Sequence, residues 1–135
     1  PPMKLEAVAD RGRDLGYTPK LRNLSSRMAV SVSDMLAWIL ENIDREKKED
    51  LANTILKGFG RALGEVAVIS MKGLRNARQC IVIGGGAAVN THIVKGVKET
   101  VRSHGIDVIL PRRLPPGDGG IALGQILVAS TRFYG

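Results

Sequence analysis

The stretch QCIVIGGGAAVN, residues 79–90, decides the fold. Its first five residues are a short run of β-favouring, mostly apolar side chains, and Gly84, Gly85 and Gly86 follow directly. After these glycines, apolar residues recur every four positions, which predicts a helix that ends near Gly105. The pattern therefore predicts a strand, a glycine loop and a helix, in that order.

A second short strand is predicted directly after this helix. Asp107 to Leu110 is again mostly apolar and ends at Pro111. Two strands joined by a helix favour parallel pairing through a right-handed crossover. A second glycine-rich turn, residues 115–120, then opens onto a final helix from Ile121. We therefore expect an α/β fold with a small, mostly parallel sheet packed with several helices.

The pattern of the N-terminal half of the sequence predicts three helices and one short strand. Ser33 is a good capping residue for the second helix, and the charged residues 44–50 read as a solvated loop that leads into the third. Gly58, Gly60 and Gly64 lie inside the third helix, where each costs about 1 kcal/mol relative to Ala, so we expect close packing on a neighbouring backbone. The expected helices cover residues 1–12, 31–43 and 51–71, and the strand covers residues 27–31.

The size and composition of the chain are those of an ordinary globular domain. With 135 residues, of which 44% are hydrophobic and 24% charged, we expect a single domain over residues 1–135. The longest apolar stretch is interrupted by Gly124 and Gln125 and is shorter than the ~20 residues that span a bilayer, so no membrane partner is expected. A secretion signal is not apparent, and we expect a cytoplasmic protein. The start at Pro1, without Met, suggests a piece of a longer chain.

Charge and residue usage narrow the partners. A net charge of +7 favours phosphates, nucleotides or nucleic acid. One Trp, two Tyr and two Phe give little material for base stacking, which makes nucleic acid the less favoured partner. Cys80 is the single cysteine, which excludes an intramolecular disulfide, and we interpret it as a small hydrophobe. Neither His92 nor His104 has a partner histidine at helical spacing, and both are expected on the surface.

Each glycine turn allows two interpretations. The three glycines at 84–86 let the backbone approach a ligand closely, and the start of the following helix favours an anion. The GxGxxG and P-loop spacings are both absent, so a simple tight turn stays open. Asp118, in the second turn, is either a helix cap or a ligand for a cation. Since both turns flank the same small sheet, they are expected to converge on one cleft at the carboxyl ends of its strands.

These residues carry a resemblance to a known family. Residues 84–90, followed after a helix and a strand by residues 110–125, resemble the C-terminal, Kae1-like lobe of the hydrogenase-maturation carbamoyltransferases, the HypF family. The run PPGDGGIALGQ, residues 115–125, is the most specific part, and residues 2–7 resemble the family's first helix of this lobe. The resemblance implies the second lobe of an RNase H-like, actin-like ATPase (ASKHA-type) fold.

The resemblance also implies a function. The lobe would bind ATP or the adenylate part of carbamoyl-adenylate, and the carbamoyl group would pass to a cysteine of a partner hydrogenase-maturation protein. Gly85, Gly86 and Asn90 would line the adenosine site, Glu6 would approach the ribose hydroxyls, and Asp118 would bind a divalent metal (Mg, Fe or Zn) near the phosphate. No catalytic residue is assigned.

Some family features are absent from the chain. The paired histidines that complete the metal site belong to the family's first lobe, and the family usually has Ser at position 84 and often His at position 60. The chain also lacks the regions that would make carbamoyl-adenylate. We therefore expect it to be inactive without a first lobe, supplied by the same or another chain. A non-catalytic interaction module that forms a homo-oligomer is the alternative, and a small enzyme that acts alone is a third possibility.

Overall fold

A computed structural model describes residues 2–25, 27–74, 78–111 and 115–134, of which Pro2, Met3 and Tyr134 are described by backbone only. Pro1, at the start of the expected first helix, lies outside the described residues. Residues 112–114, within the stretch that carries the family resemblance, also lie outside them.

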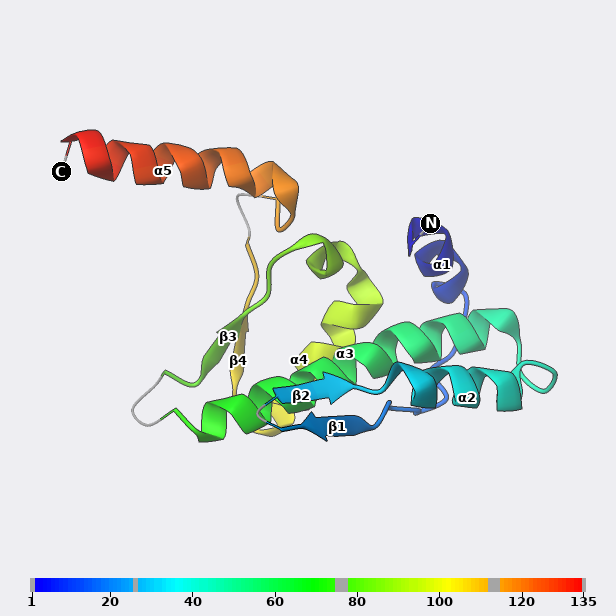
Figure 1. Ribbon diagram of the computed structural model, residues 1–135. Helices are drawn as coiled ribbons and strands as arrows, with labels where there is room; N and C mark the ends of the chain where they lie inside the picture. Colours follow the sequence, from blue (N-terminus) through cyan, green and yellow to red (C-terminus); the bar gives the residue numbers. More distant parts are fainter. Residues whose placement is uncertain (1, 26, 75–77, 112–114, 135) are drawn as a thin grey trace.

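Helices dominate the fold, and the strands form two short pairs (Figure 1). The first pair, β1 with β2, is antiparallel, and the second pair, β3 with β4, is parallel as predicted. The α/β fold class is thus confirmed, although the strands are divided between two pairs and β1 was not anticipated. The elements are α1 (Pro2–Ala9), β1 (Leu21–Leu24), β2 (Arg27–Val30), α2 (Val32–Asn42), α3 (Lys48–Lys72), β3 (Cys80–Val82), η1 (Gly86–Val89), α4 (Thr91–Ser103), β4 (Asp107–Ile109), η2 (Asp118–Gly120) and α5 (Ile121–Tyr134).

The cap of α2 differs from the prediction. Ser31, not Ser33, is the N-cap, and its hydroxyl accepts a hydrogen bond from the Asp34 N–H at 3.3 Å. The Ser33 hydroxyl instead accepts one from the Arg22 guanidinium at 2.9 Å. The expected cap was wrong because β2 ends at Val30 and the helix begins two residues later, which leaves Ser31 in the extended conformation of a cap.

The core lies where α3 and α4 pack side by side and meet the parallel strands. A Cβ atom on Gly60 would fall on the Ile93 carbonyl oxygen, and one on Gly96 would fall on the Lys57 carbonyl oxygen. The expected packing of glycines on a neighbouring backbone is therefore confirmed. Each fully buried aliphatic side chain contributes roughly 1.5–3 kcal/mol to the free energy of folding. The buried cluster consists of Val68, Met71, Val97, Val101 and Ile106, and Ile81, Ile83 and Val108 pack against it.

The segment between α1 and β1 runs along α3 and is tied to it by polar side chains. Asp50 was expected in a solvated region, but it is only 3% exposed, and its carboxylate accepts a hydrogen bond from the Arg13 N–H at 2.7 Å. This hydrogen bond lowers the pKa of Asp50. The Thr54 hydroxyl likewise accepts one from the Leu15 N–H at 2.8 Å. The expectation failed for Asp50 because its partner lies 37 residues away in the sequence.

Candidate functional site

The two glycine turns meet in space. The Gly85 N–H donates a hydrogen bond of 2.5 Å to the Pro116 carbonyl oxygen. A Cβ atom on Gly117 would lie 3.8 Å from the Cα atom of Gly86, so the two backbones pass close to each other. The two turns meet as expected, and residues 84–86 and 115–120 lie in one region of the surface, but these residues line two hollows and not the single expected cleft.

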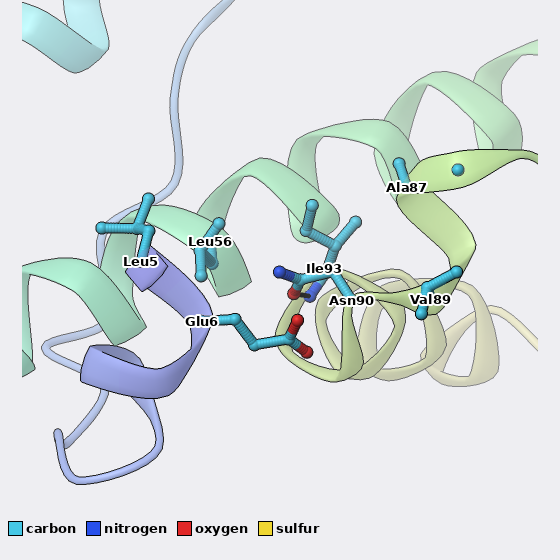
Figure 2. A pocket seen from close by; sticks show the side chains of 8 residues that line it. Leu5, Glu6, Leu56, Ala87, Val89, Asn90 and Ile93 are labelled. Atoms are coloured by element: carbon cyan, nitrogen blue, oxygen red, sulfur yellow. Dashed lines mark hydrogen bonds between the residues drawn. The ribbon is translucent and has the colours of Figure 1, made fainter. Parts of the chain in front are cut away.

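A cavity of about 340 Å³ opens on the α1 side of the first turn. Its walls come from α1, α3, η1 and α4, and Figure 2 shows the Glu6 carboxylate directed toward Asn90 at the start of α4. Apolar side chains make up most of the lining, which is the usual composition of a small-molecule site. The lining residues are Leu5, Glu6, Leu56, Gly86, Ala87, Val89, Asn90 and Ile93.

A second, more open hollow of about 450 Å³ borders the same turn at Gly85. Asp118 is its one charged lining residue among the part of the chain that the structure describes. The residues assigned from the sequence are thus divided: Glu6, Gly86 and Asn90 line the first cavity, and Gly85 and Asp118 line the second. The second hollow is lined by Gly85, Pro111, Pro115, Pro116, Gly117, Asp118, Gly120 and Ile121.

No described side chain covers the backbone of the first turn at Gly85 and Gly86. Gly85 has a φ of +90°, a conformation that side-chain-bearing residues rarely adopt. A Cβ atom on Gly86 would meet no atom within 4 Å, and this glycine lies on the cavity wall. The turn therefore presents main-chain atoms directly to whatever occupies the cavity.

Asn90 and Glu6 both bind the first turn of α4. The Asn90 side-chain oxygen accepts hydrogen bonds from the N–H groups of His92 at 3.1 Å and Ile93 at 3.0 Å, so Asn90 is the N-cap of this helix. Oε1 of Glu6 accepts hydrogen bonds from the Thr91 N–H at 2.9 Å and from its hydroxyl at 3.3 Å. The helix start is thereby held from two sides, and the two polar groups of the cavity keep fixed positions.

His92 contradicts its expected place on the surface. Its side chain is buried, and Nε2 lies 2.8 Å from Oδ1 of Asp10 while Nδ1 lies 3.4 Å from the side-chain nitrogen of Asn53. The expectation failed because α1 and α3 cover the start of α4, a tertiary contact that the local sequence does not signal. His104 is exposed, as expected.

Sequence reasoning also missed Thr91, Asp10 and the apolar cavity wall. Thr91 and Asp10 belong to contacts that span 85 and 82 residues. The one local signal is the spacing of Glu6 and Asp10, which places two carboxylates one turn apart on the same face of the chain at α1.

A metal site is not completed within the described part of the chain. No group of three or more His, Cys, Asp or Glu side chains there is arranged to hold a metal ion. Asp118 is exposed and supplies a single carboxylate. The same part of the chain contains no helix with the length and hydrophobicity to cross a bilayer.

The fold and the joined turns place the chain in a known class, a lobe of the Kae1-like, ASKHA-type fold. The crystal structure of HypF from T. kodakarensis superimposes with a TM-score of 0.79 at 24% identity, over 96% of this chain and 16% of that one. A full-length HypF structure in the phosphate- and nucleotide-bound form gives a TM-score of 0.70 at 21% identity, over 98% of this chain and 17% of that one.

Sequence comparison then defines the family. Residues 1–125 match the model of the family described as "Carbamoyltransferase, Kae1-like Domain, second subdomain", and the chain belongs to this family. The probable carbamoyltransferase HypF of Methanocaldococcus jannaschii is 29% identical over 128 residues, which cover 93% of this chain and 16% of the relative. The chain therefore spans about a sixth of the length of the full-length proteins that it resembles.

Proposed function

We propose that the chain is the adenylate-binding lobe of a carbamoyltransferase and that it works together with a first lobe. ATP or carbamoyl-adenylate would place its adenosine in the cavity lined by Glu6, Gly86 and Asn90 and its phosphate at the turn around Gly85. The observation that carries this proposal is the hydrogen bond between Gly85 and Pro116, because it makes the two cavities neighbours on one turn. A full-length HypF that shares this fold has a structure in the phosphate- and nucleotide-bound form, which agrees with a nucleotide as the ligand class.

The first cavity suits an adenosine. Leu5, Leu56 and Ile93 provide apolar walls for a base. Within the described residues, the side-chain hydrogen bonds of Glu6 both go to its Oε1 atom, which leaves Oε2 to accept a bond from a ribose hydroxyl. The lining thus combines a hydrophobic slot with one oriented carboxylate.

The turn itself suits the phosphate. A backbone without side chains at Gly85 and Gly86 can approach an anion closely, and the net charge of +7 favours anions over long range. In the proposed transfer, an acceptor cysteine thiolate attacks the carbamoyl carbon, the bond from that carbon to the phosphate oxygen breaks, and AMP leaves. The Gly85 N–H is already bound to the Pro116 carbonyl oxygen, so other main-chain N–H groups of the turn would stabilise negative charge on the leaving group. The acceptor is a hydrogenase-maturation protein in this proposal.

The proposed metal requires ligands beyond those that the described residues supply. Asp118 supplies one carboxylate oxygen, which is a suitable donor for a hard divalent cation but is insufficient alone. The shortage of ligands agrees with the proposal that a first lobe completes the site.

Gly86→Val tests the nucleotide site. The Cβ atom at this position meets nothing, so the variant should fold, and the change adds a branched side chain at a residue that lines the cavity. We expect ATP affinity, measured by isothermal titration calorimetry with Mg²⁺, to fall by about tenfold or more. Asn90→Ala is a poorer test because loss of the N-cap costs about 1 kcal/mol in helix stability.

Gly124→Val is the matched control, since a Cβ atom there also meets nothing and the residue lies on α5. Titrations would use the chain alone and the chain mixed with the first lobe of a full-length family member. Absence of ATP binding by the unmodified chain in both settings would refute the proposal, as would equal binding by the unmodified chain and Gly86→Val.

A second candidate function is a non-catalytic interaction module. The observation in its favour is α5, whose apolar side chains are exposed along its length. A stable homo-oligomer in light scattering, together with no affinity for ATP, would favour this candidate over the nucleotide-binding lobe. The exposed apolar residues of α5 are Ile121, Leu123, Ile126, Leu127, Val128 and Phe133.

A further inference from the structure

His92 is a buried, titratable side chain that the proposed function does not use. It is 4% exposed, and its Nε2 atom lies 2.8 Å from Oδ1 of Asp10. Because a carboxylate only accepts hydrogen bonds, Nε2 must carry the proton in this pair. The residue therefore donates a charge-assisted hydrogen bond from α4 to the end of α1.

The end of α1 is also held by α3. The side-chain nitrogen of Asn53 donates hydrogen bonds to the carbonyl oxygens of Ala9 at 2.9 Å and Gly12 at 3.0 Å. The same nitrogen lies 3.4 Å from Nδ1 of His92. Asp10, Asn53 and His92 thus form one cluster that joins three helices.

The cluster lies one helical turn from the carboxylate of the cavity. Glu6 and Asp10 are four residues apart, so they lie on the same face of the chain at α1. Their partners, Thr91 and His92, are consecutive residues of α4. Two bonds, one turn apart, fix both the position of α1 and its rotation about its own axis.

We propose that His92 is a positioning residue that orients Glu6 through Asp10 and thereby sets the preference of the site for ribose over deoxyribose. The inference rests on the proposed function, because it needs a nucleoside in the cavity. Packing alone does not require a histidine at this position, since the neighbouring buried residues of α4, Val94 and Val97, are aliphatic. The Asp10 side chain is 63% exposed, so its bond to His92 contributes little to the buried core. Its contribution is to orient α1.

His92→Leu and His92→Gln separate the two roles. Leucine fills the space without a donor, whereas the glutamine amide can still donate to Asp10. We expect the unmodified chain to bind ATP about fivefold more tightly than 2′-deoxyATP and the leucine variant to lose most of that preference, with the glutamine variant retaining it. Isothermal titration of the full 135-residue chain, alone and mixed with the first lobe of a full-length family member, measures both affinities. His104→Leu, at the exposed end of α4, is the matched control.

A second measurement needs no ligand. Hydrogen exchange of the Thr91 amide, followed by NMR, reports the bond to Glu6 directly. We expect faster exchange in His92→Leu and unchanged exchange in His92→Gln and His104→Leu.

The outcomes distinguish the two proposals. If ATP and 2′-deoxyATP affinities fall by the same factor in His92→Leu, or neither changes, His92 does not set ribose preference and the inference is overturned. If the unmodified chain binds neither nucleotide, alone or mixed with the first lobe, the proposed function and the ribose role both fail. In that case, the exchange rate of the Thr91 amide would still be informative. A rate that rises in His92→Leu but not in His92→Gln would confirm that His92 helps to position Glu6 in the fold.

Discussion

At the scale of single residues, Asp14 is a partly buried carboxylate that two cationic side chains surround. It accepts hydrogen bonds from Arg61 at 2.6 Å and from the Gly16 N–H at 2.9 Å, and the Lys57 ammonium lies at 3.2 Å. Burial raises the pKa of Asp14, but these partners together outweigh it and hold the pKa at about 2. The carboxylate therefore stays ionised well below the pH at which a free aspartate is protonated.

This pKa predicts a loss of stability in acid. The folded-state pKa lies below the unfolded value of 3.8, so the contribution is present above about pH 4 and disappears as the pH falls toward 2. A shift of this size corresponds to about 2 kcal/mol in the free energy of unfolding. Asp14→Asn should be less stable than the unmodified chain at pH 6, and the difference should shrink near pH 2, in urea denaturation followed by circular dichroism. Asp44→Asn, at an exposed position, serves as control, and a pH-independent difference would contradict the prediction.

At the scale of elements, the glycine contact between α3 and α4 governs stability. A methyl group on Gly60 must displace the Ile93 backbone, because the contact is with a carbonyl oxygen and not with a flexible side chain. Gly60→Ala should therefore lower the free energy of unfolding by about 1–3 kcal/mol, measured by urea denaturation. Gly124→Ala, where a Cβ atom meets nothing, should instead leave it unchanged or raise it by up to about 1 kcal/mol. Equal stability of the two variants would show that α4 can shift without cost.

The sequence predicted the elements that carry a strong periodic signal. The apolar repeat of α3, the strand before Gly84 and the helix after Asn90 all lie where the pattern indicated them. Strand β1 was missed because three of its four residues are exposed, so it lacks the alternation that marks a strand. The first turn of α3 was missed because it is charged, and only the packing of the whole helix reveals that it belongs there.

The same distinction between local and long-range signals applies to the candidate site. The glycine turns and their convergence could be predicted because glycine at a strand end and parallel strand order are local features. The partners of Glu6 and His92 could not, since those contacts join residues 85 and 82 positions apart. The resemblance assigned Asn90 to ligand binding, and its structural role as the N-cap of α4 was therefore not predicted.

At the scale of the whole molecule, α5 extends away from the body formed by the other helices (Figure 1). Its apolar side chains, including Phe133 at 81% exposure, contribute little to the buried core. Removal of residues 121–135 should therefore change the Tm by no more than about 4 °C, measured by circular dichroism. Any self-association seen by light scattering should decrease at the same time. A truncated chain that fails to fold would show that α5 belongs to the folding unit.

The contact between Gly60 and Gly96 also restricts how the cavity can change its selectivity. Because the backbones of α3 and α4 are already in contact, the two helices cannot move closer together around a smaller ligand. The positions of Leu56 and Ile93 on the cavity wall are therefore fixed by the packing of these helices. Under the proposed function, a redesign of this lobe for a bulkier base would therefore shorten those two side chains. Substitutions that push α3 and α4 apart would instead unfold the lobe.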